Sequence, residues 1–200
     1  MTERKVFILS PARTDGERAQ LLLRAEASFD LAKRIRAGDG APIGEIFAFL
    51  SGLYFRGKLA YAARFAPSPE DVHVITSSRG LVPPETLFNF EELRALGEVP
   101  IDARDIRYRE PLERDAKAIA RAAPSAQVVL LGSVASGKYV DVLLEAFGAR
   151  LHFPADFVGR GDMSRGGLML RAVDAGQELA YIPVSGAVRT GKRPPKLERR

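Results

Sequence analysis

Short apolar runs alternate with longer amphipathic stretches along this chain. The run at 6–9 is apolar, 72–76 contains His73 and Thr76 among apolar residues, and 127–131 is nearly all apolar. All three predict strands, and the composition of 127–131 is typical of a strand that is covered on both faces of a sheet. Two further short strands are predicted at 151–153 and 179–184. Because helical stretches separate the strands, the pattern favours a parallel or mixed sheet.

Apolar residues at three- and four-residue spacing predict the helices. The predicted helices span 17–36, 43–65, 111–122, 139–147 and 168–175. The second is expected to break near Gly52 and Gly57, and Pro111 is expected in the first turn of the third, where proline is favoured. Aromatic residues recur through 43–65 at a spacing typical of a buried helix face, so we interpret them as core.

Together these elements predict one α/β fold. We expect a single compact domain over residues 1–187, with a mixed, mostly parallel central sheet flanked by helices. A length of 200 residues suits one domain of this kind. The remaining residues, 188–200, contain Pro and Gly and few apolar positions, and they are predicted to form a disordered tail.

The positive charge of the chain is confined to that tail. The chain carries 30 basic and 25 acidic residues, a net charge of +5, and the tail contributes six basic residues and one acidic residue. Residues 1–187 are therefore neutral. A basic tail can bind nucleic acid through non-specific phosphate contacts. The alternative is a solubilising end without a specific partner.

Composition excludes several classes of chemistry. The chain has no cysteine and two histidines, His73 and His152, far apart in the sequence, so we expect no thiol nucleophile, no metal site and no cofactor. The chain begins directly with an apolar segment too short for a signal peptide, and no apolar run approaches the roughly 18 residues of a membrane span. We expect a cytoplasmic protein without a membrane partner.

Three loops that directly follow predicted strands carry most of the candidate binding residues. In α/β sheets, ligands bind beyond the carboxyl ends of the strands, so these loops are expected to share one site. Their candidate anion-binding residues are Ser10, Arg13 and Thr14, then Ser77, Ser78 and Arg79, then Gly132, Ser133, Ser136, Gly137, Lys138 and Tyr139.

The third loop, Gly132–Lys138, has the spacing of a phosphate-binding loop between a strand and a helix. The next residue is Tyr139, where such loops carry a Ser or Thr that holds magnesium. Three interpretations remain open. The loop belongs to a nucleotide triphosphatase, or it is a general anion site at a helix N-terminus, or it is a purely structural turn.

A fourth segment, Gly159–Gly167, combines two arginines with four glycines. Glycines at this density are costly unless a ligand or a close-packed partner requires them, and arginine suits phosphate or carboxylate groups. The candidate binding residues are Arg160, Gly161, Ser164 and Arg165. In the alternative interpretation, Ser164 caps the following helix and the arginines pair with Asp156 or Asp162. The candidate catalytic residues in the whole chain are Ser10, Asp162 and Ser164.

The order of these four segments resembles the peroxide stress protein YaaA family. The matching elements are Ser-Pro-Ala-Arg-Thr at 10–14, Ser-Ser-Arg-Gly-Leu-Val at 77–82, the strand, loop and helix start at 130–139, and Arg-Gly-Asp-Met-Ser-Arg at 160–165. The resemblance implies a YaaA-like fold, DNA binding and a role in protection against oxidative stress. The helix-hairpin-helix to which DNA binding in that family is attributed has no convincing counterpart here.

Three functional hypotheses follow. In the first, the protein is a nucleic-acid-associated member of the YaaA-like superfamily, and Arg13, Arg79, Arg160 and Arg165 line an anion-binding pocket. In the second, it is an enzyme acting on a nucleobase, nucleoside or nucleotide through base modification or N-glycosidic chemistry, with a phosphate-bearing small molecule as its partner. The third, ranked last, is the phosphate-loop nucleotide triphosphatase.

Overall fold

The structure is a computed structural model that describes residues 4–195 and 197. It is an α/β fold whose six-stranded mixed sheet has the order β4-β3-β1-β6-β7-β8. The strands of the main sheet are β1 (Lys5–Leu9), β3 (Val72–Ile75), β4 (Leu81–Val82), β6 (Gln127–Leu131), β7 (Leu151–Pro154) and β8 (Tyr181–Pro183). A separate two-stranded antiparallel ladder joins β2 (Ala41–Pro42) and β5 (Leu87–Phe88).

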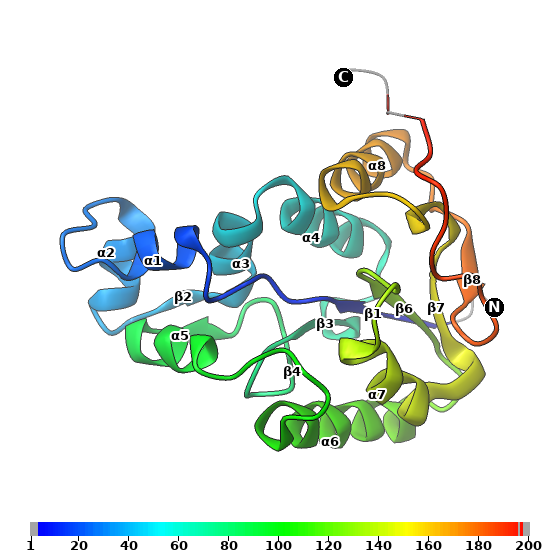
Figure 1. Cartoon of the computed structure of the whole chain (residues 1–200), viewed down its shortest axis with the longest axis horizontal. Coiled ribbons are helices and arrows are strands. Elements are labelled where there is room, and N and C mark those ends of the chain that lie inside the picture. Colours follow the sequence, from blue (N-terminus) through cyan, green and yellow to red (C-terminus); the bar gives the residue numbers. More distant parts are fainter. Residues whose placement is uncertain (1–3, 196, 198–200) are drawn as a thin grey trace.

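The helices cover both faces of this sheet. They are α1 (Glu17–Leu23), α2 (Asp30–Arg36), α3 (Ile43–Ser51), α4 (Leu53–Phe65), α5 (Phe90–Gly97), α6 (Ile106–Ala122), α7 (Gly137–Phe147) and α8 (Asp162–Ala175), with short 3-10 turns at Pro69–Asp71, Gly148–Arg150 and Ala155–Phe157. Figure 1 shows α3, α4 and α8 on one side of the sheet and α6 and α7 on the other. The predicted fold class is confirmed.

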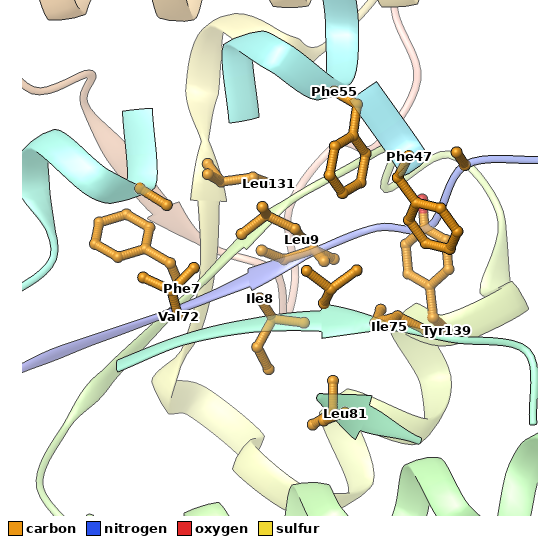
Figure 2. Packing of buried hydrophobic residues seen from close by; sticks show 14 of the residues in the cluster. Phe7, Ile8, Leu9, Phe47, Phe55, Val72, Ile75, Leu81, Leu131 and Tyr139 are labelled. Atoms are coloured by element: carbon orange, nitrogen blue, oxygen red, sulfur yellow. The ribbon is translucent and has the colours of Figure 1, made fainter. Parts of the chain in front are cut away.

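The four central strands, β3, β1, β6 and β7, are parallel, and the edge strands β4 and β8 are antiparallel. The strand β1 lies at the centre, with Phe7 aligned to Val72 on one side and to Val129 on the other. Helices pack on both faces of β1, and its residues 6–9 are at most 2% exposed. Figure 2 shows Phe7, Ile8 and Leu9 within this core.

Several helix boundaries differ from the sequence prediction. The predicted helix at 17–36 is two helices, because the chain turns extended at Arg24 and restarts after Phe29, whose ring stacks on Phe49 at 5.2 Å. Arg36 donates hydrogen bonds to the carbonyls of Ala25 and Ala27 in this connection, so the broken segment keeps partners for its backbone.

Three further predictions are corrected. The helix at 43–65 breaks at Gly52, which has a φ of +58°, but it continues through Gly57. The third predicted helix begins at Ile106, capped by the Asp105 side chain, and therefore contains Pro111 in its interior rather than in its first turn. The last helix begins at Asp162, so residues 162–167, two thirds of the segment predicted as a loop at 159–167, are helical. Gly161, not Ser164, is its N-cap residue.

The tail residues that the structure describes have no helix or strand, and they run along the protein surface. Arg189 lies 3.7 Å from the carboxylate of Asp141 on α7. At Gly159, a Cβ atom would lie 2.2 Å from the carbonyl oxygen of Lys192, so the tail backbone occupies the space that a side chain would fill. The boundary at 187 and the disorder of the tail stay predictions, and Lys196 and residues 198–200 lie outside the described residues.

Candidate functional site

The loops that follow β1 and β6 meet at the carboxyl end of the sheet. The two strands are neighbours and parallel, with Leu9 aligned to Leu131. The chain after β1 enters the helical layer that contains α3 and α4, whereas the chain after β6 enters α7 on the opposite face (Figure 1). Such a divergence is a topological switch point, where doubly wound sheets open a crevice and bind ligands.

Two adjoining cavities occupy this point, with volumes of about 920 Å³ and 270 Å³. We call them together the switch-point cleft. The residues that line both are Pro11, Ala12, Arg13, Ser133, Tyr139 and Asp162. The larger cavity extends along the segment 97–102 and to Ser136 and Lys138, and the smaller one extends to Ser10, Ser51 and Tyr54.

Ser10 is the first residue after β1, and it is bound to a lysine that the sequence analysis did not single out. Its side chain lines the smaller cavity, although the residue is only 4% exposed. The Nζ atom of Lys58 lies 2.8 Å from both the Oγ atom and the carbonyl oxygen of Ser10. Lys58 itself is 1% exposed on α4, with Nζ 4.1 Å from the centre of the Tyr54 ring.

Burial changes the acidity of this lysine. Removal from water disfavours the charged ammonium and lowers the pKa of Lys58 to about 7, with Arg165 lowering it further and Asp162 opposing the shift. Near neutral pH, a large share of the molecules therefore hold a neutral amine. A neutral amine can accept the Ser10 hydroxyl proton while one of its own N–H groups donates to the Ser10 carbonyl.

Tyr139 and Gly132 complete the surroundings of Ser10. The Tyr139 hydroxyl forms hydrogen bonds with Ser10 and with the backbone of Ser133, and burial raises the pKa of this phenol. A Cβ atom at Gly132 would lie 2.7 Å from the Ser10 Cβ and 3.2 Å from the Tyr139 hydroxyl. Gly132 therefore allows close packing against Ser10. Tyr139, which occupies the position where a phosphate-binding loop carries Ser or Thr, contacts Ser10.

The first turn of α8 forms another wall of the cleft. Asp162 is its first residue, lines both cavities and has a 66% exposed side chain. Arg165 is buried and donates to the Phe157 carbonyl at 3.2 Å and to Asp162 at 3.4 Å. It lies beside Lys58 and Tyr54, where it affects the pKa of both groups. The candidate catalytic residue Asp162 is therefore accessible from the cleft, whereas Arg165, which was expected to line the pocket, packs beneath it.

Several other sequence candidates are held by partners within the protein. Arg13 binds Asp15, Arg79 binds Glu92 at 2.6 Å, and Arg160 binds the Asp156 carbonyl and the Ser164 hydroxyl. The hydroxyls of Thr14 and Ser77 both donate to the carbonyl of Leu96. The candidates that do not line either cavity of the cleft are Ser77, Ser78, Arg79, Gly132, Gly137, Arg160, Gly161, Ser164 and Arg165.

The Gly132–Lys138 loop joins β6 to α7, as its spacing predicts. The cap residue Ser136 makes no side-chain hydrogen bond to the helix, so its hydroxyl does not satisfy the N–H groups of the first turn. The Asp141 carboxylate packs against Gly137, where a Cβ atom would lie 2.1 Å from its oxygen. A negative charge at this place disfavours a triphosphate in the loop.

No known relative identifies the chain: it matches no family model, no curated protein and no solved structure. The structure defines a class, a doubly wound α/β protein with a cleft at its switch point and a serine bound to a buried lysine in that cleft. The resemblance to the YaaA family stays a prediction. Within the described residues, no group of three or more acidic or histidine side chains could hold a metal ion.

Proposed function

We propose that this protein is an enzyme that acts on a nucleoside or nucleotide, with Ser10 as its nucleophile and Lys58 as the general base. The observation that carries the proposal is the 2.8 Å contact between the buried Lys58 amine and the Ser10 hydroxyl at the switch-point cleft. An isolated buried lysine destabilises a protein, and its pairing with a cavity-lining hydroxyl is the arrangement by which lysine activates serine.

The proposed step transfers one proton and forms one bond. The Ser10 hydroxyl proton passes to the Lys58 amine, and Oγ attacks an electrophilic carbon or phosphorus atom of the substrate. The leaving group departs with the bonding electron pair and takes the proton from the Lys58 ammonium, while the Asp162 carboxylate lies at the cleft wall as a hydrogen-bond acceptor for the substrate. A water molecule or second substrate then releases the product from Oγ, and the serine is re-protonated.

A fluorophosphonate probe tests the nucleophile without knowledge of the substrate, because an activated serine displaces fluoride from its phosphorus atom. Mass spectrometry of the full chain should find the label on Ser10. Ser10→Ala should abolish labelling, and Lys58→Met should slow it at least about 100-fold, as loss of a general base does. Ser125→Ala removes an exposed hydroxyl outside the cleft and serves as the matched control.

The pH profile provides a second criterion. Because the neutral amine is the active form and the pKa of Lys58 is about 7, the labelling rate should rise through neutral pH and level off above about pH 8. Labelling spread over several serines, or an equal rate in Lys58→Met, would overturn the proposal.

Nucleic-acid binding is a second candidate function, in keeping with the YaaA resemblance and a role in oxidative-stress protection. The specific observation in its favour is that Lys192 and Arg193 are exposed on the described part of the basic tail. Such side chains are free to contact phosphates. Among the described residues, no helix is long and apolar enough to cross a membrane, and a cytoplasmic location is part of the proposal.

A further inference from the structure

The charges that line the larger cavity of the cleft narrow the substrate class. Two cations, Arg13 and Lys138, face four carboxylates, so acidic groups outnumber basic ones. The four carboxylates are those of Asp15, Glu98, Asp102 and Asp162. A lining of this composition is unsuited to a ligand with three or four negative charges, because each added phosphate would face more carboxylates than cations.

Ion pairs neutralise most of these charges, because Asp15 pairs with Arg13, Asp102 with Arg104 and Asp162 with Arg165. The Arg13 guanidinium binds Asp15 at two points, with distances of 3.1 and 3.2 Å. Asp102 pairs with Arg104, and this contact lowers the pKa of Asp102 to about 2, so its carboxylate is charged at every physiological pH. Lys138 has no ion-pair partner among the described residues and lies in the first turn of α7. It provides one position for one phosphate group.

The other groups of the cleft fit a sugar and a base. Carboxylates such as those of Glu98 and Asp102 accept hydrogen bonds from sugar hydroxyls, as an acidic residue does in dinucleotide sites. Val99, Pro100 and Ile101 form an apolar segment of the same wall, against which a planar ring can pack. A volume of about 920 Å³ lies within the range of small-molecule sites.

An unsatisfied group in the smaller cavity points independently to a ligand. Tyr54 lines this cavity and is 5% exposed. Its hydroxyl interacts with the Arg165 guanidinium in a geometry short of a full hydrogen bond, and no other polar partner lies in reach among the described residues. A buried hydroxyl is stabilised by a well-formed hydrogen bond, and a substrate oxygen beside Ser10 would supply one.

We infer that the cleft takes a ribonucleoside monophosphate, with its single phosphate at Lys138 and its sugar hydroxyls at the carboxylates of the 97–102 segment. The inference rests on the proposed function, since it names the substrate of the same site. It adds a selectivity that the catalytic pair does not imply, namely a preference for one phosphate over none and over three.

Titration calorimetry on the full chain tests this selectivity apart from catalysis. The Ser10→Ala variant is titrated with the four ribonucleosides, their 5′-monophosphates and their triphosphates. For the preferred base, the monophosphate should bind about 10-fold more tightly than both the nucleoside and the triphosphate, the ratio that one net charge interaction provides. The 2′-deoxy monophosphate should bind more weakly than its ribose counterpart.

Two variants in the same background assign the charges. Lys138→Ala should remove the preference for the monophosphate over the nucleoside. The double variant Glu98→Gln and Asp102→Asn should tighten triphosphate binding and weaken the contrast between ribose and deoxyribose. Glu110→Gln removes an exposed carboxylate of α6 that does not line the cleft, and it should change nothing.

The outcomes separate the two proposals. If Ser10 is labelled by the fluorophosphonate but no nucleoside or nucleotide binds, or if the triphosphate binds most tightly, the inference is wrong and the catalytic pair stands. If the monophosphate binds with the expected selectivity while Ser10 is unreactive, the substrate class stands and the nucleophile is wrong.

Discussion

A single buried lysine distinguishes this cleft from an ordinary loop cluster. Lys58 occupies a position in which an apolar side chain would pack on Tyr54 and Phe55, and its ammonium is within 4.9 Å of both rings. Burial lowers the pKa of Lys58 from 10.5 to about 7. Between pH 7 and pH 10.5, Lys58 is therefore protonated in the unfolded chain but mostly neutral in the folded chain. Burial of Lys58 destabilises the protein by the full amount below about pH 7, and this destabilisation disappears as the pH rises toward 10.5.

Lys58→Met should therefore stabilise the protein while it removes the proposed base. The free energy of unfolding should rise by on the order of 2–4 kcal/mol near pH 6, after allowance for the two lost hydrogen bonds to Ser10, and the gain should shrink toward about pH 10. Urea denaturation of both proteins at the two pH values measures the difference. If the variant is less stable than the parent protein at both pH values, Lys58 has an ordinary pKa and its role is to stabilise the fold.

The packing of Gly132 against Ser10 leads to a second prediction at the scale of one residue. Gly132→Ala places a methyl group 2.7 Å from the Ser10 Cβ, which forces the serine away from Lys58. We expect a loss of about 1–3 kcal/mol in stability and a large loss of Ser10 labelling. Gly16→Ala, where a Cβ atom meets nothing within 4 Å, is the matched control, and equal labelling of both variants would contradict the packing argument.

The sequence located Ser10 but not Lys58, for a physical reason. The stretch 43–65 contains so many aromatic residues that its buried face reads as core, and Tyr54 and Tyr61 confirm that interpretation. Lys58 lies four residues after Tyr54 and three before Tyr61, on the same face. A lysine on a buried helix face is rare unless it has a partner, so the spacing of Lys58 from the two tyrosines was the signal that could have identified it. Its partner, Ser10, could not be predicted, because the contact depends on how α4 packs on the sheet.

At the scale of elements, two glycines set the distance between α4 and α8. A Cβ atom at Gly166 would lie 2.8 Å from the Leu53 carbonyl oxygen, and one at Gly57 would lie 2.8 Å from the Gly166 carbonyl oxygen. The two backbones are therefore in direct contact. Lys58 follows Gly57 and Arg165 precedes Gly166, so this crossing brings the base and the first turn of α8 together. The glycines of the 159–167 segment are in part explained by close packing.

Gly166→Ala should separate these helices. We expect a destabilisation of about 1–3 kcal/mol and slower labelling of Ser10, because Lys58 moves with α4. The adjacent Gly167→Ala is the control. Its Cβ atom would meet only the Leu197 side chain at 3.4 Å, and alanine in a helix gains up to about 1 kcal/mol over glycine. Denaturation curves should therefore show a lower stability for Gly166→Ala and an equal or higher one for Gly167→Ala, and only Gly166→Ala should slow the labelling of Ser10.

At the scale of the whole molecule, the strand order explains how much of the site was predictable. Three loops were grouped because each follows an apolar strand, and β3, β1 and β6 do lie parallel and adjacent. Only the loops after β1 and β6 meet at the cleft. From β1 the strand order runs through β3 to β4 toward one edge of the sheet, and from β6 it runs through β7 to β8 toward the other edge. The loop after β3 leads instead to the antiparallel strand β4, and its Arg79 binds Glu92. The sequence pattern does not contain this strand order.

The charge distribution of the whole molecule supports the last prediction. The tail holds the entire net charge of +5, and the charged residues that line the larger cavity are four acids and two bases, so duplex DNA should bind through the tail alone. Fluorescence anisotropy across a salt series should give a log–log slope of about −2 to −5 for the full chain, at about −0.9 per phosphate contact. Residues 1–187 should not bind.

A full-length variant separates charge from any effect of truncation on folding. Lys192→Gln with Arg193→Gln removes two exposed cations and leaves the tail backbone against Gly159. The slope should fall in magnitude by about 2, with equal effect on all DNA sequences, because phosphate contacts carry no sequence information. Binding by residues 1–187 with a preference for one nucleic acid would instead place recognition in the neutral domain. The cleft would then be a site for a base within a polymer rather than for a free monophosphate.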